Sequence, residues 1–237
     1  MYSEIINCLR LSSFPNKFIF VSKDVTSDVN FVFCELLSHY VNKHFTVILL
    51  NFEQSYAHYN HMLLKSGVNM RLLKENQQII TIDCLSEIEK LTNIEALDVN
   101  QNAAFKDLFD SEKVVSVKTL CYLIKKTVQK LIDESKQFII FIDDINSLLN
   151  LGIKVTCILS FVQYCRSLCF EDAQNLMLIG SVYAKEDLMN KKLVEYLFHV
   201  ADIKIQVEGL KTGYSKDIHG KVCTILIFLN MIMFIIY

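Results

Sequence analysis

The sequence predicts an α/β protein with a mostly parallel central sheet, flanking helices and a C-terminal antiparallel edge hairpin. Short apolar runs alternate with helical patterns along the 237 residues, and this order favours parallel strands joined by helices. The run Phe138–Ile142 is wholly apolar and ends in Asp143 and Asp144, as expected of a buried parallel strand that delivers acidic groups to one sheet edge. Apolar residues make up 52% of the chain and Pro15 is its single proline, so the chain can bury a core.

The spacing of apolar residues, and the breaks between apolar runs, place the strands and helices in order along the chain. Strands are expected at 18–21, 45–51, 78–83, 138–142, 176–180 and 203–207. Between them, apolar residues recur three and four positions apart, which is the spacing of an amphipathic helix. This spacing predicts helices at 29–41, 117–132, 155–169 and 185–198. Residues 86–112 are polar with weak apolar periodicity, so we expect a loop or lid there.

The edge hairpin is predicted from residues 208–220, which hold half of the six glycines. The segment has the pattern of a strand end, a glycine turn, a short polar strand and a second turn that leads into a strand at 221–228. Lys211, Lys216 and His219 on its exposed face are candidates for contact with phosphate. A solvated hairpin is the more common case, because charged edges guard against unwanted strand pairing.

The last sixteen residues, 222–237, form an apolar run that only Thr224 and Asn230 interrupt. As a helix the run would reach about 24 Å, which is short of the ~30 Å hydrocarbon core of a membrane. Two alternatives stay open: an undersized membrane anchor, or a core strand followed by an apolar end that a neighbour must cover.

Charge and cysteine content narrow the class of protein. The 24 basic and 26 acidic residues give a formal net charge of −2, too weak a field to predict nucleic-acid binding by itself. Eight cysteines without framework-like spacing indicate reduced thiols in a cytosolic or nuclear setting. The first twenty residues lack the pattern of a signal peptide.

Asp143 and Asp144 stand where a nucleotide-driven motor keeps the Walker B carboxylates that hold Mg²⁺. Such proteins also wrap phosphate in a glycine-rich loop after an earlier strand. Here the corresponding residues, 22–28, contain no glycine and carry Asp24 and Asp28, which would repel phosphate. The sequence therefore favours a role in which one of the two carboxylates caps the short segment 145–150.

Other candidate sites are weaker. A divergent ATPase would use Lys23 and Thr26 in place of the missing lysine and hydroxyl of the phosphate loop. His58 and His61 share a helix face but lack a third zinc ligand nearby in sequence. Cys165 and Cys169, four residues apart, are expected in the core rather than in a redox pair. The sequence contains no G-x-S-x-G motif, so it gives no support to a hydrolase. We therefore predict no catalytic, cofactor-binding or metal-binding residues.

Four separated segments resemble the family of the sixth Elongator subunit, and the likeness extends over about residues 1–222. The segments are QSYAHY at 54–59, SLLNLG at 147–152, FVQYCR at 161–166 and EGLKTGYSKDIHG at 208–220. The resemblance implies a RecA-like fold that has lost its Walker A loop. Members of this family continue past residue 220 with a polar tail, whereas residues 223–237 of this chain form an atypical apolar tail.

The resemblance also implies partners. Family members join the fourth and fifth Elongator subunits in a hexameric ring with two copies of each, and this ring binds tRNA. The ring supports modification of the wobble uridine, while the chemistry resides in another subunit with an iron–sulfur cluster. The chain would then be a non-catalytic subunit of the cytoplasm and nucleus. The alternatives are the divergent ATPase and a tail-anchored membrane adaptor.

Overall fold

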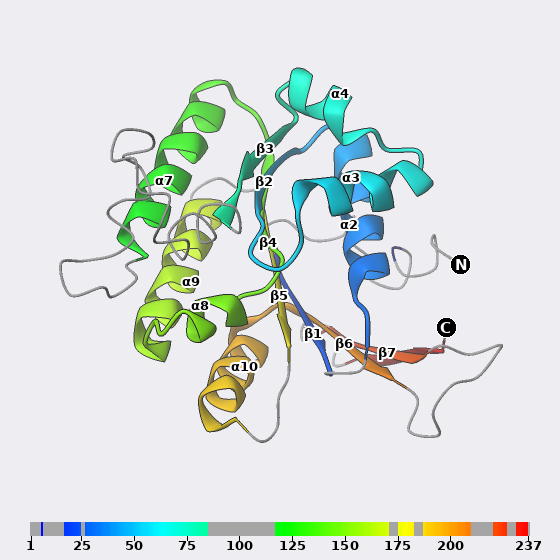
Figure 1. The fold of residues 1–237 in the computed structure, drawn as a ribbon, viewed down its shortest axis with the longest axis vertical. Coiled ribbons are helices and arrows are strands. Elements are labelled where there is room, and N and C mark those ends of the chain that lie inside the picture. Colours follow the sequence, from blue (N-terminus) through cyan, green and yellow to red (C-terminus); the bar gives the residue numbers. More distant parts are fainter. Residues whose placement is uncertain are drawn as a thin grey trace, which may run out of the picture.

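The computed structural model describes residues 6, 17–24, 27–84, 117–170, 175–182, 187–209, 220–226 and 231–236. Within them, one eight-stranded sheet has the order β3-β2-β4-β5-β1-β6-β7-β8 (Figure 1). The strands are β1 Lys17–Lys23, β2 Thr46–Leu50, β3 Ile79–Ile82, β4 Phe138–Ile142, β5 Leu176–Val182, β6 Ile203–Gly209, β7 Gly220–Leu226 and β8 Met231–Ile236.

Strands β1 to β6 run parallel, while β7 pairs antiparallel with β6 and β8 antiparallel with β7. All five residues of β2 and of β4 are buried, as expected of central strands covered on both faces. The predicted parallel sheet and its antiparallel end are thus confirmed. Residues 210–219, where the turns and the short polar strand of the hairpin were expected, lie outside the described residues.

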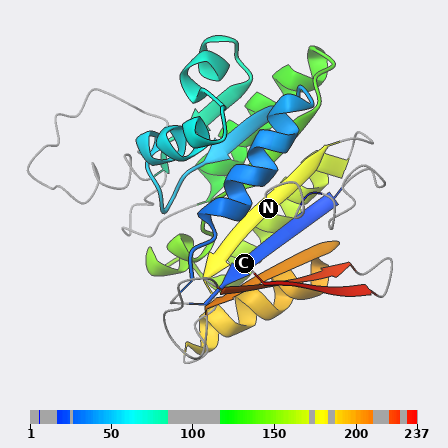
Figure 2. The ribbon, with the colours of Figure 1, turned by 90° about the vertical axis from the view of Figure 1, so that its right-hand side faces the viewer.

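Helices cover both faces of the sheet (Figures 1 and 2). They are α2 Asn30–Asn42, α3 Tyr56–Lys65, α4 Met70–Glu75, α7 Lys118–Asp133, α8 Asn146–Asn150, α9 Val155–Phe170 and α10 Leu188–Val200. One apolar cluster joins α7 to α10 with side chains such as Phe18 and Ile140. A second cluster joins α2, α3 and α4 with neighbouring residues of the same strands, such as Ile19 and Ile139. The alternation along β1 and β4 therefore supplies a core to each face.

The expected helices and strands are confirmed within a few residues at each end. Helix α10 begins at Leu188 rather than at residue 185, because the Asp187 carboxylate accepts a 2.9 Å hydrogen bond from the Met189 N–H and caps the helix there. Helix α4 and strand β8 were not predicted. Helix α4 has only six residues and buries only Met70, so it carries little periodic signal.

The apolar C-terminal run contributes two strands to the sheet in its described parts. Strand β7 confirms the expected strand at 221–228 over residues 221–226, and residues 227–228 lie outside the described part of the chain. Strand β8 pairs with β7 from Lys221 opposite Ile236 to Leu226 opposite Met231. Among the described residues, no helix has the length and apolar character needed to span a membrane.

Candidate functional site at the carboxyl edge of the sheet

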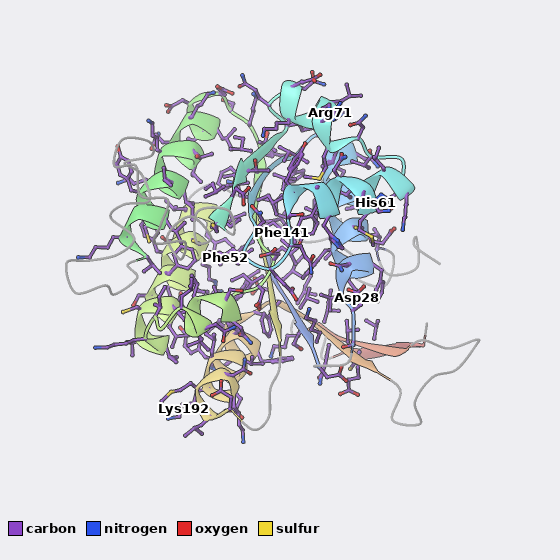
Figure 3. The ribbon with its side chains drawn as sticks, viewed as in Figure 1. Asp28, Phe52, His61, Arg71, Phe141 and Lys192 are labelled. Carbon is purple, nitrogen blue, oxygen red and sulfur yellow. The ribbon has the colours of Figure 1, made fainter. Side chains whose placement is uncertain are left out.

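The carboxyl ends of the parallel strands meet at one edge, where α/β proteins usually bind ligands. Strand β1 ends at Lys23, β2 is followed by Phe52 and Glu53, and β4 is followed by Asp143 and Asp144. Phe52 lies close to this end of β4 in the view of Figure 3. The residues singled out in the sequence, Asp143 and Asp144, therefore lie at the expected place.

The Asp143 carboxylate holds the loop that follows β2. Its Oδ1 accepts hydrogen bonds from the backbone N–H groups of Phe52 (2.7 Å) and Asp144 (2.8 Å). Its Oδ2 accepts from the N–H groups of Glu53 (3.1 Å) and Gln54 (3.0 Å) and from the Tyr59 hydroxyl (3.3 Å). An ionised carboxylate offers about four lone-pair positions. Protein donors therefore occupy the acceptor capacity that a metal ion would need.

Burial opposes the negative charge at this position. Asp143 is only 2% exposed, and desolvation raises the pKa of its carboxyl, while the four backbone N–H donors act in the opposite direction. Burial also raises the pKa of the Tyr59 hydroxyl, and the neighbouring Asp143 charge adds to that shift. Tyr59 therefore stays a neutral donor to the carboxylate.

Asp144 caps the short helix α8, as the sequence predicted for one member of the pair. Its Oδ1 accepts a hydrogen bond from the Asn146 N–H (3.1 Å), and its Oδ2 accepts from the Ser147 hydroxyl (3.0 Å). Burial raises the pKa of Asp144 to about 6, and the nearby Glu53 charge contributes to the rise. The helix ends at Asn150, and Gly152, with a φ of 83°, donates its N–H to the Leu149 carbonyl just beyond that end.

The loop after β1 is organised by carboxylates and hydroxyls. The Asp24 Oδ2 accepts a hydrogen bond from the Gly209 N–H (3.0 Å), and the Ser27 hydroxyl donates to the Val207 carbonyl (3.0 Å). Asp28 accepts from the Asn30 N–H (2.8 Å) at the start of α2. These contacts tie the loop to the end of β6 with an acidic side chain turned toward the protein backbone.

Lys23 and Glu53 form an ion pair across this edge, with 2.7 Å between Nζ and Oε1. Strands β4 and β5 lie between β1, which ends at Lys23, and β2, which precedes Glu53. The ion pair therefore spans the ends of the two central strands. It engages the lysine that a divergent phosphate loop would need, while Thr26 lies outside the described residues.

A close approach of backbones at Gly180 fixes the turn after β4. The Ile145 N–H donates a 3.0 Å hydrogen bond to the Gly180 carbonyl. A Cβ atom on Gly180 would lie 2.1 Å from the Asp143 backbone oxygen and 2.5 Å from the Phe33 ring. Only glycine fits here, so Gly180 sets the spacing between β5 and the two carboxylates.

The other sequence candidates lie apart from this edge. His58 and His61 are on α3, where His61 is exposed and the His58 ring stands edge-on to Tyr59. Within the described ranges, no three His, Cys, Asp or Glu residues form a metal-binding group. Cys165 and Cys169 are fully buried in the core, as predicted. Lys211, Lys216 and His219 lie outside the described residues.

Sequence reasoning missed the partners that give the site its shape, Glu53 and Tyr59. Both are near or within the segment 54–59, yet nothing in their local pattern points to Asp143, more than 80 residues later. The segment 161–166 is structural as well. Arg166 lies 4.0 Å from the Asp202 carboxylate and over the Phe170 ring, and Gln163 hydrogen-bonds the Tyr196 hydroxyl at 2.5 Å.

Comparisons with known proteins agree on one family. The model of the family described as Elongation complex protein 6 matches residues 2–228. The mouse Elongator complex protein 6 is 27% identical over 231 residues, which cover 93% of this chain and 84% of the mouse protein. The human protein is 25% identical over 207 residues, with 84% of this chain and 75% of the human protein covered.

Solved structures with similar folds share little sequence with this chain. A KaiC-like protein of Pyrococcus horikoshii aligns with a TM-score of 0.55 and 12% identity over 90% of this chain and 79% of that one. The flagellar accessory protein FlaH of Methanocaldococcus jannaschii aligns with a TM-score of 0.57 and 10% identity over 94% and 83%. The fold is RecA-like, as expected from the resemblance in sequence.

Proposed function

This chain belongs to the Elongation complex protein 6 family, and we propose that it is a non-catalytic structural subunit of the Elongator complex. In this proposal it forms a hetero-hexameric RecA-like ring with the fourth and fifth subunits, two copies of each. The assembled ring binds tRNA and supports modification of the wobble uridine by another subunit. In this proposal the RecA-like domain without a Walker A loop spans residues 1–222, and residues 223–237 form an atypical apolar C-terminal tail. The protein would work in the cytoplasm and nucleus.

The observation that carries the non-catalytic role is the saturation of Asp143. Five protein donors share its carboxylate, and Asp144 is engaged by Asn146 and Ser147. Metal-ion catalysis at a Walker B carboxylate requires free oxygen ligands for Mg²⁺. A carboxylate pair used to hold two turns supports an architectural role over nucleotide hydrolysis.

We expect the purified chain to give no calorimetric binding signal with Mg-ATP at micromolar concentrations. The reason is that Lys23 is paired with Glu53, and the neighbouring loop carries Asp24 where a phosphate would need donors. The variant Glu53→Gln releases Lys23 and serves as the control. Micromolar binding by the wild type that Lys23→Ala abolishes would favour the divergent ATPase.

Partner dependence tests the ring. Co-expression with the fourth and fifth subunits should yield one discrete assembly with two copies of each, because closed rings need every interface to be filled. Native mass measurement of the purified assembly gives the stoichiometry. A stable monomer that co-purifies with neither subunit would contradict the proposal.

A further inference from the structure

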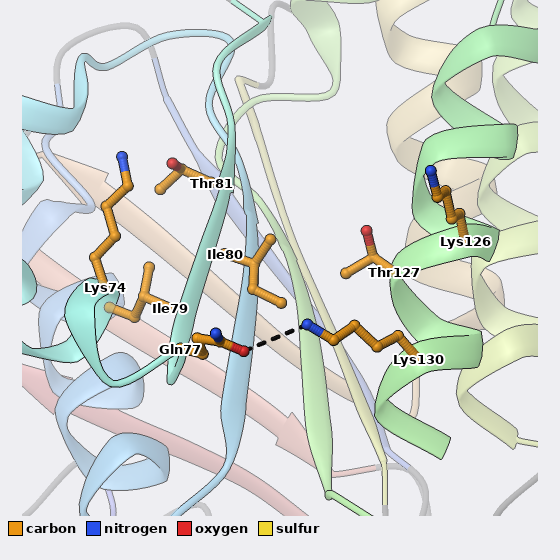
Figure 4. A pocket seen from close by; sticks show the side chains of 8 residues that line it. All are labelled: Lys74, Gln77, Ile79, Ile80, Thr81, Lys126, Thr127 and Lys130. Atoms are coloured by element: carbon orange, nitrogen blue, oxygen red, sulfur yellow. Dashed lines mark hydrogen bonds between the residues drawn. The ribbon is translucent and has the colours of Figure 1, made fainter. Parts of the chain in front are cut away.

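A hollow of about 670 Å³ lies beside strand β3, at the end of the sheet opposite β8. Strand β3, the turn before it, helix α4 and helix α7 supply its walls (Figure 4). The eight lining residues are Lys74, Gln77, Ile79, Ile80, Thr81, Lys126, Thr127 and Lys130. None of them is acidic, and the carboxylate site described above lies elsewhere, at the ends of β2 and β4.

The hollow follows the edge of β3 rather than one face of the sheet. Ile79 belongs to the apolar cluster of the α2 to α4 face, whereas Ile80 packs against the cluster of the α7 face. A space lined by consecutive residues of one strand must extend around the side of that strand. In the described part of the chain, β3 pairs only with β2, so its other side carries no strand.

The backbone of β3 directs polar groups into this hollow. The Val47 N–H of β2 donates to the Gln78 carbonyl (2.9 Å), and the Asn51 N–H donates to the Ile82 carbonyl (3.4 Å). Because successive peptide groups of a strand point to opposite sides, the backbone groups of Ile79 and Thr81 point away from β2. They are oriented to pair with an added strand.

Lysines stand on both sides of this open edge. Lys74 comes from α4 on one face, and Lys126 and Lys130 are one turn apart on α7 on the other face. The Lys130 Nζ hydrogen-bonds the Gln77 Oε1 at 3.3 Å across the hollow (Figure 4). Lys126 and Lys130 are both exposed, so a carboxylate can reach them without loss of a buried contact.

We propose that the outer edge of β3 binds an extended acidic peptide segment of a partner protein, which adds a strand to the sheet. Alternate side chains of an added strand project to opposite faces. Acidic residues at consecutive positions would therefore reach Lys74 on one face and Lys126 and Lys130 on the other. This inference goes beyond the proposed ring role and does not depend on it.

The test measures binding of a fluorescein-labelled peptide of sequence GVEDVEDVG to the full chain by fluorescence anisotropy. We expect saturable binding that weakens as salt rises, because the rim contacts are between exposed charges. The analogue GVQNVQNVG should bind at least about tenfold more weakly, since it keeps the strand-forming residues and loses the charges. Equal binding of both peptides would overturn the charge-based part of the proposal.

Two sets of variants locate the contact. Lys126→Glu combined with Lys130→Glu should weaken peptide binding at least about tenfold by replacing attraction with repulsion. Lys125→Glu, an exposed neighbour on the same helix that does not line the hollow, should leave the affinity unchanged. If Lys125→Glu weakens binding as much as the double variant, the peptide binds to the charge of α7 and not to the hollow.

Strand addition itself is tested at Thr81. Thr81→Pro removes the outward N–H and leaves the bonds to β2, whereas Thr81→Ala removes only the side chain. We expect Thr81→Pro to reduce binding and Thr81→Ala to retain it, with urea melts to establish that both variants are folded. A folded Thr81→Pro variant with wild-type affinity would exclude backbone pairing. If the chain binds a single-stranded twelve-nucleotide RNA through these lysines and does not bind the peptide, the peptide proposal is wrong and the lysines form a nucleic-acid-binding surface.

Discussion

Gly180→Ala should lower the free energy of unfolding by about 3 kcal/mol or more, because a single added carbon has no room. Its Cβ would lie 2.1 Å from the backbone oxygen of Asp143, which cannot move aside as a flexible side chain can. The added Cβ would also lie 2.5 Å from the Phe33 ring, so the Cβ cannot move away from the Asp143 oxygen in that direction. Strand β5 or the turn after β4 must therefore shift. Urea unfolding followed by circular dichroism measures the loss.

Gly152→Ala is the matched control for this prediction. Gly152 has a φ of 83° and no atom within 4 Å of the position of a Cβ, so alanine there meets backbone strain without a clash. That strain is worth about 1–2 kcal/mol. The comparison separates steric contact from backbone conformation. A Gly180→Ala variant that is as stable as Gly152→Ala or more so would show that β5 and the turn after β4 are not held in close contact.

The elements of the sheet could be predicted because their signals are local. The strand Phe138–Ile142 was placed at its observed ends, since five apolar residues between polar ones mark a buried strand. Strand β8 was not predicted, because a continuous apolar run has no alternation to distinguish a strand from a helix. Its partner β7 lies largely in the same run, at residues 222–226, so no contrast in the sequence marks where one strand ends and the other begins.

The site could be predicted only in part, since its contacts join distant segments. The cap on α8 was expected because Asp144 lies two and three residues before its partners. The role of Asp143 was not, because its partners Phe52, Glu53 and Gln54 are about 90 residues away. The Lys23–Glu53 ion pair is likewise a consequence of the strand order. A single sequence carries no local signal for such pairs.

The open edge of β3 shows the same limit. Its lysines come from α4 and α7, two helices more than 40 residues apart, and only the fold brings them around one strand. Taken one at a time in the sequence, these lysines have no pattern that distinguishes them from other surface charges. Their common position beside an edge that no other described strand pairs with is a property of topology.

Asp143→Ala should lower the free energy of unfolding by about 3 kcal/mol, more than a surface carboxylate would cost. The substitution leaves the N–H groups of Phe52, Glu53 and Gln54 without their acceptor, and the Phe52 N–H lies in a buried hydrogen bond. Removal of a buried charge offsets part of this loss, because desolvation already disfavours the carboxylate. The unpaired donors outweigh that gain, since each costs about 1–3 kcal/mol when buried.

Amide hydrogen exchange distinguishes this role from a general loss of stability. In Asp143→Ala, exchange should accelerate first at Phe52, Glu53 and Gln54, because these amides lose their acceptor directly. Asp144→Ala is the control: it removes only the cap on α8, worth about 0.5–2 kcal/mol, and should leave the 52–54 amides protected. If Asp143→Ala unfolds at the wild-type urea concentration and keeps these amides protected, the carboxylate does not hold the loop. Its charge would then be available to a ligand, and the architectural role of the pair would have to be abandoned.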